Sequence, residues 1–381
     1  MIKTKKVSSL IPDKLSKSRL VVFLAIIIII PSMLAGCTRN PIEIVGGSGP
    51  ISVGNGIYLS TTDGRILAIN PSSGQIKWQF PSSVSDLKMK GIIGAPVIDN
   101  ETLFFGSYDG KVYALDAGTG VQKWQYPSTE NVGAIIGTPM VYNDTVFVGT
   151  ADDELYALKT DTGEARWLRP FKADDKIWAT PAGNDNTIYI GSSDDNLYAI
   201  DIISGNELWS FPTEGAIVGD AVISDDIIYF GSFDNNLYAV STDGKLKWKY
   251  PGGDWFWARP VVNNGIIYAG CADSNIYALN IQDGSKKWVF TTSDIIRSSP
   301  VMIGESLAVA SVDGKIYILN PTTGSKIAEF PLYKSEEDAK GKSVLSPLAA
   351  EGETIYLHST DQILWALDTT TGKWREVCST K

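Results

Sequence analysis

Short runs of alternating hydrophobic and polar residues fill the chain from about residue 50 onward. Between Thr180 and Pro212 four such runs follow one another, namely TPAGN, TIYIGSS, NLYAID and ELWSFP. The segments between them contain DN, DD and ISG, which favour tight turns. No segment keeps a hydrophobic period of 3.6 residues. The pattern therefore predicts short β-strands joined by hairpins, with almost no helix after residue 37.

The phrase LYAIDIISGNELWSFP, from Leu197 to Pro212, recurs with variations eight times. A period of about 40 residues with strand-like content is typical of a propeller or a repeat array. A four-stranded sheet has two open faces, and a ring of such sheets buries each face against a neighbour. The repeats predict an all-β fold, an eight-bladed β-propeller of four-stranded antiparallel blades over residues 48–381. In the eight copies, the position of Tyr198 is occupied by Leu67, Tyr113, Tyr156, Tyr198, Tyr238, Tyr277, Tyr317 and Trp365.

Within the phrase, alanine, glycine and tryptophan recur at fixed spacing, as in Ala199, Gly205 and Trp209. This spacing resembles the tryptophan-docking motif of propellers of the pyrroloquinoline quinone (PQQ) type. In that family each tryptophan packs against the alanine and glycine of the adjoining blade. The resemblance implies a structural role for six tryptophans: Trp78, Trp124, Trp167, Trp209, Trp248 and Trp288.

The last two copies depart from the motif. The seventh has Ile318 and Ala328 in place of alanine and tryptophan, and the eighth has Glu376 at the tryptophan register, with Trp374 two positions early. We therefore expect the contacts among blades seven, eight and one to be the weakest of the ring. Residues 41–46, PIEIVG, are candidates for an extra strand there.

The N-terminus predicts export and lipidation. Residues 1–19 carry six basic side chains and one acidic one, and an apolar run of eleven residues follows, too short for a comfortable membrane span. The run leads to LAGC, Leu34 to Cys37, which resembles the bacterial lipobox. In lipoproteins the chain is cut before this cysteine, whose thiol carries a diacylglyceryl group. We predict a removed signal peptide (1–36), a tether (37–47) lipidated at Cys37, and the propeller; an uncleaved signal anchor and a structural Cys37 are the alternatives.

Charge and cysteine content narrow the partners. Without residues 1–36 the chain holds 27 basic and 42 acidic residues, a net charge near −15. Such a surface repels nucleic acid and anionic lipid head groups, so neither is expected to bind the globular part. Cys271 and Cys378 lie in repeats that are not neighbours, so we expect no disulfide framework. The propeller is expected to be monomeric.

Candidate catalytic chemistry is sparse. PQQ-type propellers include quinoprotein dehydrogenases, but those enzymes are longer and usually carry adjacent cysteines and a calcium-holding Glu/Asn/Asp set. This chain has no Cys-Cys pair and no c-type haem motif, and its acidic runs do not follow the D-x-[DN]-x-[DN]-G calcium loop. The lone histidine, His358, cannot assemble a catalytic triad or a typical zinc site. We predict no enzyme activity, no cofactor and no metal.

Binding candidates lie in the segments that enter each blade, where a hydrophobic pair usually precedes a proline. The regularity of these pairs favours packing, and the alternative for the aromatic rings among them is that they plug the channel mouth. GDWFWARP, Gly253 to Pro260, differs because three aromatics and an arginine lie together, and such clusters anchor protein interfaces. The predicted binding face comprises Trp178, Trp255, Phe256, Trp257, Arg259 and Arg297.

A lipobox followed by an eight-bladed PQQ-like propeller without a cofactor constellation is similar to the BamB family, the propeller lipoproteins of outer-membrane β-barrel assembly. The resemblance implies an exported, lipid-anchored, non-catalytic scaffold for partner proteins of the cell envelope. It would lie on the periplasmic side of an outer membrane or on the outer face of the cytoplasmic membrane. Two alternatives stay open: a PQQ-binding dehydrogenase or sensor, and a surface module that binds polysaccharide or peptide through residues 255–259.

Overall fold

The computed structural model describes residues 49–83, 89, 91–333 and 343–381. The predicted signal peptide, Cys37, the tether and the candidate strand at 41–46 lie outside these residues. The described residues form strands, turns and loops and contain no helix. None of them therefore forms a helix long and apolar enough to cross a membrane.

Thirty-two strands make eight blades of four consecutive strands each. Blades 1 and 2 comprise β1 (Ile51–Val53), β2 (Gly56–Ser60), β3 (Ile66–Ile69), β4 (Ile76–Phe80), β5 (Val97–Asp99), β6 (Thr102–Gly106), β7 (Val112–Asp116) and β8 (Gln122–Tyr126). Blades 3 and 4 comprise β9 (Met140–Tyr142), β10 (Thr145–Gly149), β11 (Glu154–Lys159), β12 (Phe171–Lys172), β13 (Ala182–Asn184), β14 (Thr187–Gly191), β15 (Asn196–Asp201) and β16 (Glu207–Pro212).

The second half of the ring repeats this plan. Blades 5 and 6 comprise β17 (Val222–Ser224), β18 (Ile227–Gly231), β19 (Asn236–Ser241), β20 (Leu246–Pro251), β21 (Val261–Asn263), β22 (Ile266–Gly270), β23 (Asn275–Asn280) and β24 (Lys286–Thr291). Blades 7 and 8 comprise β25 (Val301–Ile303), β26 (Ser306–Ala310), β27 (Lys315–Leu319), β28 (Lys326–Pro331), β29 (Ala349–Glu351), β30 (Thr354–His358), β31 (Ile363–Asp368) and β32 (Lys373–Ser379).

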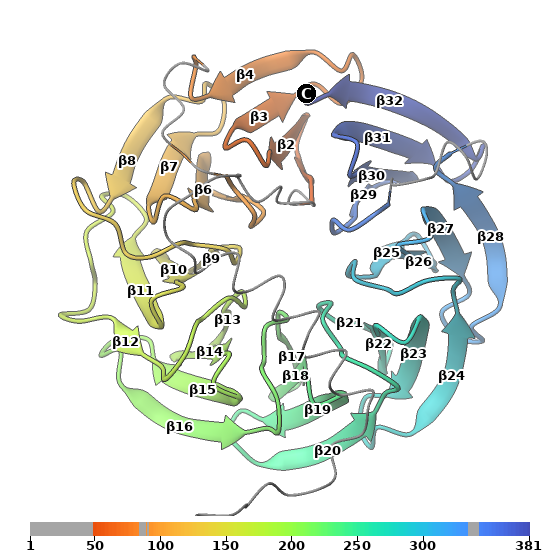
Figure 1. Cartoon of the computed structure of the whole chain (residues 1–381). Coiled ribbons are helices and arrows are strands. Elements are labelled where there is room, and N and C mark those ends of the chain that lie inside the picture. The colour runs from red at the N-terminus through yellow and green to blue at the C-terminus, as the bar shows by residue number, and fades with distance from the viewer. Residues whose placement is uncertain (1–48, 84–88, 90, 334–342) are drawn as a thin grey trace, which may run out of the picture. The chain divides into compact units, whose positions relative to one another are not determined.

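Each blade runs antiparallel from an inner strand beside the central channel to an outer strand at the rim (Figure 1). The predicted eight-bladed propeller is thereby confirmed. Among the described residues no blade takes strands from both ends of the chain, since β1 pairs with β2 and β32 with β31. The face that carries the connections between blades and the hairpins between second and third strands is called the loop face below.

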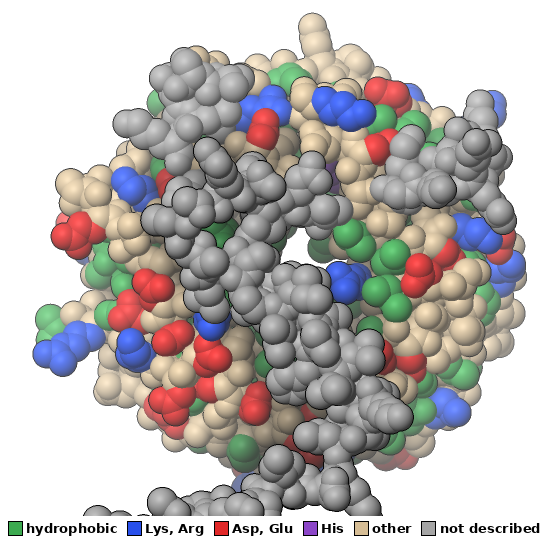
Figure 2. Space-filling view, in the orientation of Figure 1, with side chains coloured by type: hydrophobic (Ala, Val, Ile, Leu, Met, Phe, Trp, Pro, Cys, Tyr) green, Lys and Arg blue, Asp and Glu red, His purple; other side chains and the backbone are tan. Residues whose placement is uncertain are grey.

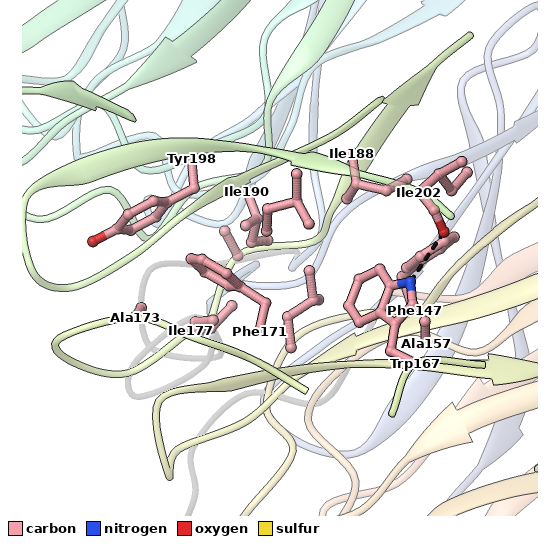
Figure 3. Close-up of a cluster of buried hydrophobic side chains, with 13 residues drawn as sticks. Phe147, Ala157, Trp167, Phe171, Ala173, Ile177, Ile188, Ile190, Tyr198 and Ile202 are labelled. Carbon is pink, nitrogen blue, oxygen red and sulfur yellow. Dashed lines mark hydrogen bonds between the residues drawn. The ribbon is translucent and has the colours of Figure 1, made fainter. Parts of the chain in front are cut away.

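Burial explains why these sequences form blades. The second and third strands are buried between neighbouring sheets. All five residues of β6 are buried, whereas residues of the outer strand β16 are exposed or half-buried. Core clusters therefore span adjacent blades. In the cluster between blades 3 and 4, Phe147 and Trp167 of blade 3 pack with Ile188 and Tyr198 of blade 4 (Figure 3).

The repeated tryptophan contacts the next blade in a constant way. Trp167 donates its Nε1 hydrogen to the carbonyl of Ile202 at 3.0 Å (Figure 3). Its ring covers Gly205. Gly205 has a φ of +73°, and a Cβ there would lie 2.6 Å from the indole. Glycine is thus required both by the left-handed turn and by the ring above it. The other five pairs of tryptophan and carbonyl are Trp78 with Ala117, Trp124 with Thr160, Trp209 with Thr242, Trp248 with Ile281, and Trp288 with Pro321.

The register of blade 8 corrects the sequence alignment. Ala199 of blade 4 faces Trp209, but Ala366 of blade 8 faces Arg375, because the bulge that lies next to this pair in blades 1, 2 and 4 to 7 is displaced to Leu364 and Trp365. Arg375, rather than Glu376, therefore stands in the tryptophan position. Its Nη2 donates to the carbonyl of Pro71 at 2.7 Å, across the contact between blades 8 and 1.

His358 occupies a position that is glycine in most blades. Gly191 pairs with Leu197, and a Cβ on it would meet Ile217 of the next connection at 2.2 Å; His358 pairs with Leu364 in the same register. The imidazole is buried, and its Nε2 lies 3.0 Å from the Thr380 hydroxyl. Burial lowers the pKa of His358 to about 4, so the ring is neutral near pH 7.

Candidate interaction site at the channel mouth

The predicted binding residues come together only in part. Trp178, Trp257 and Arg297, from the connections that enter blades 4, 6 and 7, line one cavity of about 280 Å³ at the channel mouth. Arg259 lines a neighbouring cavity of about 420 Å³ beside the inner strands. The hydrophobic pair that enters each blade is thus divided: its second member faces the channel, while the first is buried in the blade.

Phe256 does not belong to the binding face. Phe256 is the first member of the hydrophobic pair that enters blade 6. It is 1% exposed and packs against Tyr277. A Cβ on Gly231 would lie 2.4 Å from the Cβ of Phe256. The sequence-based inclusion of Phe256 was wrong, because the strand-like alternation of the segment turns Trp255 and Trp257 outward and Phe256 inward.

Phe233 replaces it in the cluster. Its ring stacks on Trp255 with centroids 4.4 Å apart and planes 12° apart, and it lies 5.2 Å from the ring of Trp257. Arg297 lies over Trp257 at 5.6 Å. We call Phe233, Trp255, Trp257 and Arg297 the aromatic row; it crosses the loop face from blade 5 to blade 7.

Phe233 was missed although the sequence carries a signal for it. The fifth copy reads GSFDN where the fourth reads GSSDD, so an aromatic replaces a small residue in the hairpin between β18 and β19, where Phe233 is half-buried. Only the fold shows that this hairpin lies beside the connection that carries Trp255. Hairpin and connection belong to neighbouring repeats and are about 20 residues apart.

Hydrogen bonds of backbone and side-chain groups hold Phe233 and Trp255 in place. Asp234, next to Phe233, accepts the Tyr238 hydroxyl at 2.5 Å and the Glu214 amide at 3.1 Å. Trp255 donates its amide to Asp254 at 2.8 Å and accepts the amide of Ala272 at 2.9 Å. Phe233 and Trp255 are therefore held before any partner binds, which lowers the entropy cost of association.

The surroundings of the row are acidic. Burial raises the pKa of Asp195, and the neighbouring charges of Asp194 and Asp234 raise it further. Burial also opposes ionisation of Asp234, but the hydrogen bonds from Tyr238 and from backbone amides outweigh it and lower its pKa. Figure 2 shows the acidic side chains gathered on the lower left, over blades 3 and 4. Within the described residues no three His, Cys, Asp or Glu side chains converge as a metal site.

The two cysteines among the described residues, Cys271 and Cys378, are free. Cys271 is buried beneath the row, where its Sγ lies 3.1 Å from the Asp254 carbonyl, and burial raises the pKa of the thiol to about 12. It therefore stays a neutral thiol rather than a reactive thiolate.

Comparisons with known proteins decide the family. A family model described as "Outer membrane protein assembly factor BamB" matches residues 38–211 and 193–344. The chain belongs to this family. A solved structure of BamB from Moraxella catarrhalis superposes with a TM-score of 0.69 at 22% identity, covering 86% of this chain and 94% of that one.

A second solved structure shares the fold of this BamB family member. The computationally designed Ika8 protein superposes with a TM-score of 0.71 at 17% identity, covering 84% of this chain and 96% of that one. At these identities both likenesses concern the fold alone. Among curated proteins, none matches the chain in sequence.

Proposed function

We propose that this chain is an exported, lipid-anchored and non-catalytic scaffold that binds partner proteins of the cell envelope through its loop face. The observation that carries the proposal is the aromatic row in a chain of the BamB family. Trp257 is 39% exposed and lies beside Phe233, Trp255 and Arg297. Tryptophan and arginine are the residue types that most often dominate interface energetics.

The family supplies the proposed partner. The matching model is described as an outer-membrane protein assembly factor, so the partner would be a component of β-barrel assembly where the cell has an outer membrane. The tether at Cys37 would hold the propeller at the membrane surface and raise the local concentration of such a partner.

Crosslinking and pull-down of the full-length protein from its native membrane test the proposal. We expect a β-barrel assembly protein among the captured partners, and we expect Trp257→Ala to lose it. Ile203→Ala is the matched control, because Ile203 is 76% exposed but lies in the β15–β16 hairpin, away from the loop face. Equal capture by both variants would remove the aromatic row from the interface.

Two further readouts separate the parts of the proposal. Cys37→Ser should release the protein from the membrane fraction while it still binds the captured partner in solution; unchanged membrane retention would point to a signal anchor. Purified protein mixed with PQQ and calcium should show no cofactor absorbance and no dye reduction, and either signal would overturn the non-catalytic assignment.

A further inference from the structure

The channel mouth has a layered lining. Seven side chains, one from each connection that enters blades 2 to 8, form its outer ring, and six of them are apolar. The only charged member is Arg297. The ring consists of Ile93, Ile136, Trp178, Val218, Trp257, Arg297 and Leu345.

The next layer toward the inner strands is polar, but bonds between blades occupy much of it. Asp220 accepts the amide of Thr180 through Oδ1 at 2.8 Å, and the Ala95 amide donates to the Thr138 hydroxyl at 3.0 Å. Thr138, Thr180 and Asp220 line both cavities, so the two cavities adjoin. One of the two Asp220 carboxylate oxygens is thereby committed to the scaffold.

The two channel arginines are not neutralised. Neither Arg297 nor Arg259 forms an ion pair with any residue that the structure describes, although the chain carries a net charge of −10. Elsewhere Arg65 pairs with Asp63 at 2.8 Å. Within the described part of the chain, the guanidinium of Arg297 lies over the face of Trp257 and forms no hydrogen bond or ion pair, so its hydrogen-bonding edge is available. A planar guanidinium fork matches a carboxylate in two parallel hydrogen bonds.

We propose that the channel mouth binds a carboxylate carried by an apolar or aromatic group. Arg297 binds the carboxylate, and Trp178, Trp257 and Leu345 contact the apolar part. An apolar ring favours this ligand over a strongly hydrated anion such as phosphate. The cavity of about 280 Å³ lies just below the roughly 300–1,000 Å³ range of ligand pockets, so it suits a group of amino-acid size.

A carboxylate on an apolar group can come from two sources. One is a free aromatic carboxylic acid, and the other is the carboxyl terminus of a peptide with an apolar last residue. The site shares Trp257 and Arg297 with the aromatic row, so a small carboxylate and a protein partner would compete for these two side chains. The test of the site is separate from the test of the scaffold, because the titration uses purified protein without a partner.

Calorimetric titration of the full-length protein in detergent tests the site with two matched pairs of probes. The first is N-acetylphenylalanine and its primary amide; the second is a peptide that ends in phenylalanine, as the free acid and as the C-terminal amide. We expect at least one acid to bind, and its amide to bind at least about tenfold more weakly because the charged hydrogen bonds are lost. Similar affinity of the two acids would indicate a small-molecule site, and a peptide acid at least about tenfold tighter would indicate a site for a chain terminus.

Arg297→Gln should weaken acid binding by about tenfold or more, and Arg297→Lys should weaken it less. Arg169→Gln is the matched control, because Arg169 is an exposed arginine in the loop between β11 and β12 of blade 3, and it lines neither cavity. Thermal unfolding of each variant verifies folding. Equal binding of acid and amide, unchanged acid binding by Arg297→Gln, or failure of both acids to bind wild-type protein would overturn the proposal.

Discussion

Neighbouring blades meet in two different ways in this propeller. From blade 1 to blade 7, each contact contains a tryptophan that covers a glycine of the next blade and donates to one of its carbonyls. Between blades 7 and 8, Ala328 stands in the tryptophan position, and the ring of Phe330 reaches Gly372 instead. Between blades 8 and 1, Arg375 stands there.

The tryptophan contacts and the contact between blades 8 and 1 share a donor to one backbone carbonyl, but they differ in the side chain that provides it. The carbonyls that accept the six tryptophans each follow the last residue of a third strand or lie one residue further, and Pro71 holds the equivalent place in blade 1. Arg375 donates to it at 2.7 Å and Arg65 donates to Thr380 at 2.6 Å, so polar bonds join blades 8 and 1 where an indole joins the others. The contact between blades 8 and 1 therefore keeps a hydrogen-bond donor to the Pro71 carbonyl, but it lacks the apolar area that a docked indole buries.

The largest effect is expected at a tryptophan contact. Trp167 is 5% exposed, so Trp167→Ala leaves a cavity between blades 3 and 4 and should lower the free energy of unfolding by about 3–5 kcal/mol. Denaturant titration measures the change. Trp257→Ala is the control, because this indole is 39% exposed and should contribute less than about 1 kcal/mol. Similar losses in both variants would show that blade contacts have no special dependence on the docked indole.

A pH-dependent effect is expected at His358, beside the contact between blades 8 and 1. In the folded state the pKa of His358 is about 4, below its usual 6.5. The stability from the neutral imidazole is therefore fully present above pH 6.5 and is lost as the pH falls from 6.5 to 4, because the unfolded chain takes up the proton first. The loss is about 3 kcal/mol at pH 4.

His358→Gln removes this titration while it keeps a polar side chain near Thr380. The difference in unfolding free energy between wild type and variant, measured from pH 7 to pH 4, isolates the histidine from the many carboxylates that titrate in both proteins. A constant difference across this range would mean that the imidazole becomes charged without cost and that the site is wetter than its burial indicates.

The smallest effect is expected at Arg375. This side chain is exposed, and Arg375→Ala removes one hydrogen bond to a carbonyl, so the loss should be about 1 kcal/mol. Arg375→Trp tests whether a tryptophan at this position can dock on blade 1 as the other six tryptophans dock on their neighbouring blades. If the variant is more stable than wild type, blade 8 has kept the docking geometry without the indole; if it is less stable, the different register of β32 has changed that geometry.

Sequence reasoning placed the four strands of blade 4 within two residues of their ends, because the alternation of side chains and the turn residues report a local property of the chain. It misaligned blade 8 because counting residues from Gly372 assumes the common bulge. The bulge beside Ala366 is displaced, and the pairing moves Arg375 opposite it. It likewise included Phe256 among the binding candidates, since an aromatic-rich segment does not show which of its rings turns inward.

The sequence by itself determined the number of blades, their four-stranded plan, the docking tryptophans and the region that carries the aromatic cluster. These follow from periodicity and from spacing within one repeat. Only the tertiary structure decided that Phe233 completes the row, that Arg297 stands alone in an apolar ring, and that Arg375 bonds to blade 1. Each of these facts joins different repeats, and the contacts between them form only when the ring brings the blades together.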